Sequence, residues 1–209
     1  MSKLSTLLCF VAFSWVSAAE VLAAEPVLVT EADTEMSLGL HLEYFEDKEG
    51  TLTLEDVLKP EVAAQFVKSQ VETPNFGLGL SSAYWFSFSL QNPDSKAIDR
   101  LLEIGYPLLD DIHYYRISEE GEREHLHLGD KLVFSKRPID HRNFVIPIHI
   151  KAGTTTRIVM RVQTSSSFRL PLALWDPYAF FANDADEMTI QSFYFGIMFV
   201  MAIYNLFVF

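Results

Sequence analysis

The sequence predicts an all-β fold, a jelly-roll β-sandwich, followed by a transmembrane α-helix. Three observations support this prediction. Apolar and polar residues alternate along several short segments, as they do in strands with one buried face. Turn residues recur between these segments at a spacing typical of two-sheet sandwiches and jelly rolls. The last stretch, residues 190–209, has no charged residue and is long enough as a helix to cross the hydrocarbon core of a bilayer.

The alternating segments set the expected strands. Phe86, Phe88 and Leu90 alternate with less apolar neighbours, and Pro147 indicates an edge position for its strand. A capping box at residues 53–56 predicts a short helix that Pro60 interrupts. The expected strands cover residues 27–30, 37–45, 84–90, 101–104, 112–117, 144–150, 158–162 and 168–174.

The two ends of the chain predict export and anchoring. Residues 1–24 have a basic start, an apolar stretch and small residues for cleavage, which is the order of a secretory signal peptide. We therefore expect a periplasmic β-sandwich over residues 25–183 and a first transmembrane helix over residues 188–209. Residues 183–187 offer an N-cap and acidic residues for the start of that helix. A buried core helix is the alternative.

Composition excludes some chemistry. Cys9 is the only cysteine and lies in the signal segment, so the exported domain has no disulfide, thiolate nucleophile or cysteine-bound metal. The net charge of -12 disfavours nucleic acid and anionic lipid as the main partner.

Four sequence strings in order resemble one known family. They are YWFSFSLQN at 84–92, LLEIGYPLLD at 101–110, FSKRPIDHRNF at 134–144, and RVQTSS at 161–166 with LPLALW at 170–175. Their order and spacing are similar to the type-2 extracellular domain of bacterial seven-transmembrane receptors with diverse intracellular signalling modules, the 7TMR-DISM family. YFGIM at 194–198 and YNLF at 204–207 resemble the start of its first membrane helix. One departure is Ser87, where the family tends to have arginine.

The resemblance implies a periplasmic jelly roll similar to carbohydrate-binding modules, then seven membrane helices and a cytoplasmic output. In the family this output is commonly a diguanylate cyclase or a histidine kinase. Neither output is present in this sequence, so we expect the chain to be a fragment of a longer receptor, a truncated gene product or a mis-called reading frame.

The loop at residues 137–143 is the first candidate for ligand binding. Arg137, His141, Arg142 and Asn143 bring guanidinium, imidazole and amide groups together within seven residues. Such groups recognise carboxylates or sugar hydroxyls. The alternative is structural, with Arg142 and Asn143 holding the loop through backbone carbonyls and Asp140.

Aromatic residues give the second candidate. Trp85 and Tyr115 sit opposite the apolar stripe of their strands, so their rings are expected to offer a surface for a sugar. Aromatic residues in a sandwich are often core residues instead. We expect Trp85 and the 137–143 loop to line one binding face.

Metal binding and catalysis are weaker readings. His125 and His127 share one face of a strand, and Glu122 or Glu124 could add a carboxylate, but a solvated edge strand explains them equally well. Asp110 and Asp111 are adjacent, so on a strand they face opposite ways and make no catalytic pair. The sequence predicts no metal, no cofactor and no enzymatic activity for this chain.

The predicted function is a ligand-sensing input domain of a membrane signal-transduction receptor in the inner membrane, with the domain in the periplasm. The expected partners are a small-molecule or glycan ligand and the membrane; a homodimer is compatible, and nucleic acid is not expected. The alternative is a membrane-anchored glycan-binding module without signalling. A secreted hydrolase is disfavoured because the motifs assemble no carboxylate pair or triad.

Overall fold

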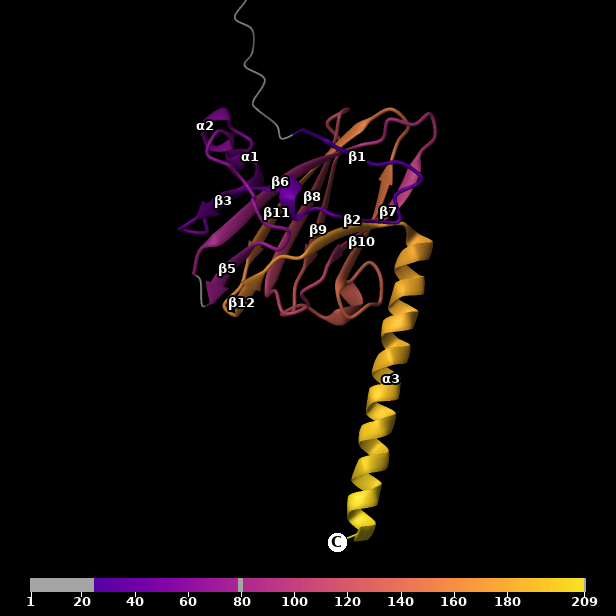
Figure 1. Ribbon diagram of the computed structural model, residues 1–209. Coiled ribbons are helices and arrows are strands. Elements are labelled where there is room, and N and C mark those ends of the chain that lie inside the picture. The colour runs from indigo at the N-terminus through magenta and orange to yellow at the C-terminus, as the bar shows by residue number, and fades with distance from the viewer. Residues whose placement is uncertain (1–24, 79–80, 209) are drawn as a thin grey trace, which may run out of the picture.

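The computed structural model describes residues 25–78 and 81–208 (Figure 1). The predicted signal peptide, residues 1–24, lies outside the described residues. Two sheets pack face to face, and a long helix, α3 (Pro177–Val208), projects from the domain (Figure 1). The predicted mostly β domain with a C-terminal apolar helix is confirmed. The jelly-roll topology and the likeness to carbohydrate-binding modules stay predictions.

The larger sheet has seven strands and the smaller sheet has four. Strand pairs in the described residues are antiparallel, apart from β1 (Val27–Leu28), which runs parallel to β6. Across the larger sheet the order is β4 (Val67–Lys68), β3 (Glu43–Asp47), β6 (Ala83–Gln91), β11 (Thr155–Gln163), β8 (Asp111–Ser118) and β9 (Arg123–Leu128). Across the smaller sheet it is β10 (Phe144–Ile150), β7 (Ile98–Ile104), β13 (Leu172–Trp175) and β2 (Glu35–Ser37). A separate pair joins β12 (Ser167–Arg169) to β5 (Asn75–Leu78).

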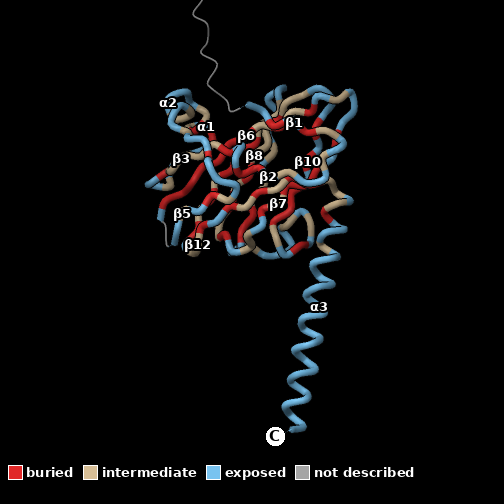
Figure 2. Tube along the Cα trace, in the orientation of Figure 1, coloured by how far each residue is buried: buried red, intermediate tan, exposed pale blue. Residues whose placement is uncertain are grey.

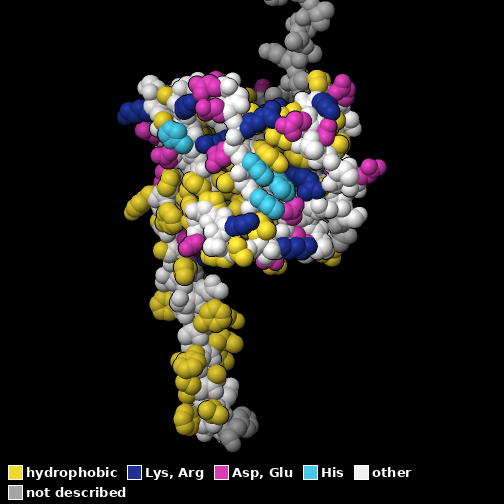
Figure 3. Space-filling view, turned by 180° about the vertical axis from the view of Figure 1, so that it is seen from behind, with side chains coloured by type: hydrophobic (Ala, Val, Ile, Leu, Met, Phe, Trp, Pro, Cys, Tyr) yellow, Lys and Arg dark blue, Asp and Glu magenta, His cyan; other side chains and the backbone are white. Residues whose placement is uncertain are grey.

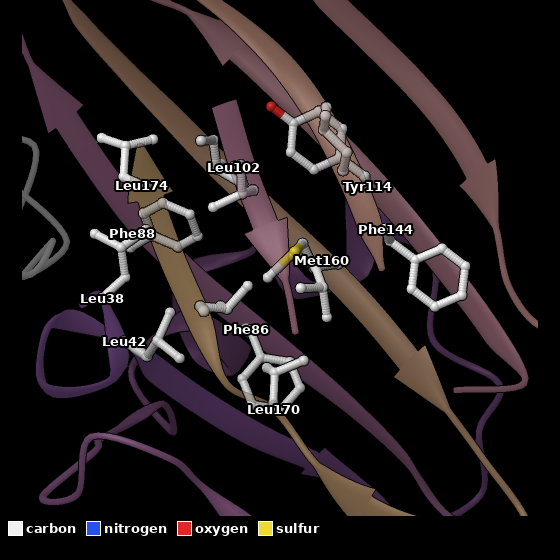
Figure 4. Packing of buried hydrophobic residues seen from close by; sticks show 14 of the residues in the cluster. Leu38, Leu42, Phe86, Phe88, Leu102, Tyr114, Phe144, Met160, Leu170 and Leu174 are labelled. Carbon is white, nitrogen blue, oxygen red and sulfur yellow. The ribbon is translucent and has the colours of Figure 1, made fainter. Parts of the chain in front are cut away.

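The main core lies between the two sheets. The alternating residues of the strands meet there, so Phe86 and Met160 of the larger sheet share one buried cluster with Leu102 and Leu174 of the smaller sheet (Figure 4). Each of these four side chains is at most 2% exposed. The period-two pattern of the sequence therefore reports the face that is buried.

Two smaller apolar clusters cover the outer faces of the sandwich. On the larger sheet, Trp85 and Val159 pack under Leu54 and Val57 of α1 (Leu54–Val57). On the smaller sheet, apolar side chains of β7, β10 and β13 pack against Phe180, in the first turns of α3. Figure 2 shows buried residues concentrated in the strands, with α3 exposed beyond its start.

Several local predictions are confirmed. The capping box is present, since Thr53 and Asp56 each accept a hydrogen bond from the other's backbone N–H. A second short helix, α2 (Pro60–Ala63), then begins at Pro60, where the sequence predicted an interruption. The strand of Pro147 lies at an edge of the smaller sheet.

The strand expected over residues 37–45 is wrong in its middle. A 3-10 helix, η1 (Gly39–His41), separates β2 from β3. At Gly39 the chain passes so close to another segment that a Cβ atom would lie 1.8 Å from the carbonyl oxygen of Glu72. The strand is interrupted at this close approach, so the alternation of apolar and polar residues does not mark one continuous strand over residues 37–45. A second 3-10 helix, η2 (Phe134–Lys136), precedes the 137–143 loop.

The start of α3 was also placed wrongly. The helix begins at Pro177, and not within residues 183–187. Asp176 caps it, because its Oδ1 accepts the backbone N–H groups of Tyr178 and Ala179, each at 3.0 Å. Proline at the first helical position and aspartate before it are a favourable start. Its 32 residues make a continuous helix of about 48 Å.

Trp85 should act as a structural residue of the outer cluster. The substitution Trp85→Ala should lower the free energy of unfolding by about 3–5 kcal/mol and the melting temperature by about 10 °C, because the indole is 1% exposed. Its Nε1 is buried without a partner, so Trp85→Phe removes an unpaired donor and should cost much less. Calorimetry of the detergent-solubilised chain measures both. Equal melting temperatures for Trp85→Ala and the unchanged chain would contradict this packing.

Candidate functional site: an outer cleft and the junction with α3

The six residues predicted to bind ligand fall into two groups on opposite sides of the sandwich. Trp85 and Tyr115 lie on the outer face of the larger sheet. The other four lie in the 137–143 loop beside the start of α3, and they are Arg137, His141, Arg142 and Asn143. The structure therefore does not bring Trp85 and the loop into the one binding face that the sequence predicted.

Arg137 holds the 137–143 loop in shape. Its Nη1 donates hydrogen bonds to the carbonyl oxygens of His141 and Arg142, each at 2.7 Å. Its guanidinium carbon also lies 4.3 Å from the ring centroid of Phe144. Burial lowers the pKa of Arg137 from its ordinary value, although an arginine stays charged. The structural role considered for this loop is thus filled by Arg137.

His141 links the loop to α3. Its Nδ1 accepts the backbone N–H of Asn143 at 3.1 Å, so its proton lies on Nε2. That Nε2 is 3.1 Å from Oδ1 of Asp184, in the second turn of α3. The side chain of His141 is 8% exposed. The imidazole is therefore a buried, oriented donor from the domain to the helix.

Arg142 reaches the same part of α3. Its Nη1 lies 2.8 Å from Oδ1 of Asp184, and its Nη2 lies 2.5 Å from Oε2 of Glu187. Asp184 and Glu187 are three residues apart and so share one helix face. One guanidinium therefore holds two acids of α3 at once. We use the name junction for the contacts of His141 and Arg142 with Asp184 and Glu187, together with the packing of Phe180.

Apolar packing and a third acid, Glu103, complete the junction. Phe180 is 3% exposed, and its ring centroid lies 6.0 Å from that of Trp175 and 5.1 Å from that of His141. Glu103 accepts hydrogen bonds from Asn143 Nδ2 at 2.7 Å and from Trp175 Nε1 at 2.9 Å. The amide of Asn143 is thus already bonded within the protein. A hollow of about 240 Å³ lies among these side chains.

A cleft lies on the outer face of the larger sheet, where the segment 50–55 passes strands β8 and β9. Its volume is about 490 Å³, and its lining includes Trp85, Tyr115, His125, Arg123 and Arg161. Asp47 fixes the approach of the segment by accepting the backbone N–H groups of Gly50 and Leu52, each at 2.9 Å. The cleft is the place where a ligand could meet the predicted aromatic residues.

Within the cleft, Tyr115 is the aromatic ring that offers surface. It is partly exposed and lies parallel to His125, with ring centroids 4.6 Å apart. Trp85 lies beyond it, 6.3 Å from the Tyr115 centroid, and is covered by α1. The outward direction of Trp85 was predicted, but its burial was not.

A row of imidazoles continues from Tyr115 along the same face. The antiparallel register places His113 opposite His127, and Tyr115 opposite His125. His125 and His127 share one face of the edge strand β9, as predicted. Burial lowers the pKa of His113, and the charge of Asp111 opposes that shift.

The carboxylate beside these imidazoles was not found from the sequence. It belongs to Asp111, which lies 2.6 Å from Nε2 of His127, while Glu124 pairs with Arg116 at 2.7 Å. Asp110 instead accepts the backbone N–H of Ser165 at 2.8 Å. The sequence does show that residues 111, 113 and 115 share one face of a strand. Only the pairing of β8 with β9 shows that Asp111 lies beside His127.

The fold and the junction define the class of protein as a mostly β domain attached to an apolar helix. The chain belongs to the family described as 7TMR-DISM extracellular 2, which matches residues 39–176. The resemblance stated from the sequence is confirmed. No curated protein matches the chain.

One solved structure with some likeness is described as a novel family GH115 4-O-methyl-α-glucuronidase with specificity for decorated arabinogalactans. The identity is 12%, with 70% of this chain covered and a TM-score of 0.35. This chain spans only 18% of that chain's length. A likeness of this size supports no conclusion about fold or activity.

The helix α3 is the membrane candidate. Among residues 25–78 and 81–208, it is the one helix long and apolar enough to cross a membrane. Two of its hydroxyls are satisfied inside the helix, since Thr189 and Ser192 donate to carbonyl oxygens four residues earlier, at 2.8 and 2.7 Å. An extracellular-domain family and one apolar helix together indicate a membrane-anchored protein.

Loss of the Arg142 contacts should loosen the junction. Arg142→Ala should raise the amide hydrogen-exchange rates of residues 178–187 by up to about tenfold, because it frees Asp184 and Glu187 while each exposed ion pair contributes about 1 kcal/mol or less. Mass-spectrometric exchange on the detergent-solubilised chain measures this. Arg123→Ala is the matched control, because Arg123 pairs with Glu55 on the other side of the domain. Identical exchange in both variants would show that the ion pairs do not hold α3.

Proposed function

We propose that this chain is the periplasmic ligand-sensing input domain of a membrane signal-transduction receptor. It takes a carbohydrate or another small ligand and relays binding to a cytoplasmic output, a diguanylate cyclase or a histidine kinase, carried by the rest of the receptor. Family membership supports the receptor class. The observation that supports sensing is the junction, because the domain grips the base of the apolar helix through His141, Arg142 and Phe180.

The mechanism is a shift between two arrangements of domain and helix. A ligand can bias such an equilibrium only by the difference in its affinity for the two arrangements. The junction gives that difference a route to the membrane, since displacement of the 137–143 loop pulls on Asp184 and Glu187 of α3. The hollow beside Glu103 and Asn143 lies at the same place. A ligand that filled it would compete with these contacts.

The alternative is a membrane-anchored glycan-binding module without signalling. The observation that favours it is the cleft on the larger sheet, with the ring of Tyr115 beside Arg123 and Arg161. An aromatic face and nearby guanidinium donors suit a sugar. The cleft lies on the side of the sandwich away from α3, so binding there needs no contact with the helix.

The two proposed functions, receptor input domain and anchored glycan-binding module, predict different sizes for the protein made in the source cell. An immunoblot of membranes from the source cell, with a tag inserted at Lys48, should show a band several times heavier than the 23.8 kDa of this chain. Ser166→Cys should react with a membrane-impermeant maleimide once the outer membrane is opened, as a periplasmic domain requires. A band near 23.8 kDa would favour the anchored module. Labelling only after the inner membrane is broken would contradict the periplasmic location.

A sugar ligand in the cleft should depend on Tyr115. On an array of bacterial envelope glycans, Tyr115→Ala should lower binding about fivefold, because stacking on an aromatic ring contributes on the order of 1 kcal/mol. Tyr115→Phe keeps the ring and should bind nearly normally. Tyr178→Ala is the remote control, since Tyr178 is 84% exposed at the start of α3. Unchanged binding by Tyr115→Ala would remove the cleft as the glycan site.

A further inference from the structure

Three imidazoles and a carboxylate meet at the edge of the larger sheet. Asp111 and His113 come from β8, and His125 and His127 come from β9. Figure 3 shows histidine side chains gathered on the face of the molecule turned away in Figure 1. One ligand atom from each of Asp111, His113 and His127 lies within 4.8 Å of the others. We call these four residues the histidine cluster.

The spacing within the cluster suits a small tetrahedral ion. Oδ2 of Asp111 lies 3.4 Å from Nε2 of His113, and its Oδ1 lies 2.6 Å from Nε2 of His127. Metal–ligand bonds of about 2.0–2.1 Å place neighbouring ligands of a tetrahedral zinc ion about 3.3 Å apart. The two spacings belong to different oxygens of Asp111, and one of these oxygens would bind the ion. The spacing between Oδ2 and His113 fits binding through Oδ2. The imidazole of His127, on a strand with no neighbour beyond it among the described residues, would then shift from Oδ1 toward that ion.

His125 is placed to orient His113. Its Nε2 lies 3.0 Å from Nδ1 of His113, and the two rings are within 5° of parallel. When His113 donates through Nδ1, the lone pair on its Nε2 points at the carboxylate of Asp111. Two acceptors then face each other, and a cation between them relieves the repulsion. A hydrogen bond on the far nitrogen is the usual support of a metal-binding histidine.

Arg161 provides the competing, metal-free explanation. Its Nη1 lies 3.2 Å from Oδ2 of Asp111 and already balances part of that charge. Its Nη2, however, donates to the carbonyl oxygen of Gly50 at 3.0 Å and to Gln163 at 2.9 Å. Arg161 therefore keeps two partners when Asp111 turns to a metal. None of the hydrogen bonds of Arg161 goes to His113, His125 or His127.

We propose that Asp111, His113 and His127 bind a divalent transition-metal ion of the zinc type, with His125 orienting His113. Imidazole nitrogens favour zinc, copper and nickel, whereas calcium and magnesium take oxygen ligands. Three protein ligands leave one coordination position open. This site goes beyond the proposed function and does not depend on it. It also departs from the sequence-based prediction of no metal, which weighed His125 and His127 with a carboxylate from Glu122 or Glu124.

The test is titration of the full detergent-solubilised chain, purified through a histidine-free tag and stripped with EDTA. Calorimetry with ZnCl₂ should show one site per chain, and CaCl₂ should show none. His127→Ala and Asp111→Asn should each weaken zinc binding by at least about a hundredfold, and His125→Ala by about tenfold as a supporting residue. Cobalt(II) bound at the site should show the visible absorption of tetrahedral coordination.

The matched control is His149→Ala. His149 also pairs with an aspartate, Asp99, at 2.7 Å, but its exposed side chain lies on β10, in the smaller sheet, whose described strands carry no other histidine. Its zinc affinity should equal that of the unchanged chain. Three results would each overturn the site: no zinc binding, zinc binding unaffected by His127→Ala and Asp111→Asn, or equal loss in His149→Ala. Metal-free melting temperatures of the variants show that each is folded.

Discussion

The junction between the smaller sheet and α3 is the contact on which the arrangement of this protein depends. Phe180 buries its ring against Trp175, while Asp184 receives both His141 and Arg142. Asp176, which caps α3, also lies 3.6 Å from the guanidinium of the buried Arg100. Buried packing and charge together fix where α3 leaves the domain. Beyond the junction, residues 188–208 of α3 are exposed, mostly apolar and without charge, and so are suited to lipid.

The two outer faces of the sandwich therefore carry different chemistry. The smaller sheet packs against the first turns of α3, and Asn143 and Trp175 beside that contact are hydrogen-bonded to Glu103. The larger sheet presents the cleft and the histidine cluster, where Tyr115, His113 and Arg161 lie partly open. Between the two faces lies a close-packed core, which favours movement of the sandwich as one body. A ligand on the larger sheet would then act on α3 through the position of the whole domain.

The sequence predicted what depends on local pattern. Strand alternation around Phe86, the edge position of Pro147 and the capping box at Thr53 are all local, and the structure has them. The start of α3 was predictable too, because Asp176 and Pro177 form a known helix start; the more acidic residues 183–187 were chosen instead. Those acids do not cap the helix, since Asp184 and Glu187 bind the 137–143 loop.

The arrangement of the candidate site could not be predicted from the local sequence pattern. A strand position facing away from the main core need not be exposed, and Trp85 is covered by α1, a segment about thirty residues earlier. The free donors expected of Arg142 and Asn143 are taken by partners about forty residues away in the chain. Asp111 joins the histidines only through the register of β8 on β9. Contacts between distant segments decided each of these outcomes, and the local pattern of a single sequence does not reveal such contacts.

The central claim is that, without ligand, the junction holds the base of α3 in one fixed arrangement against the domain. Pulsed electron spin resonance in lipid nanodiscs tests it directly, with spin labels at Pro147→Cys and Ala182→Cys in a chain that also carries Cys9→Ser. Both label sites are exposed, one on β10 and one in the first turns of α3. The account predicts a single narrow distance distribution that broadens when Arg142→Ala is added. A distribution that is broad from the outset would contradict it, because the domain would then hang freely from the helix.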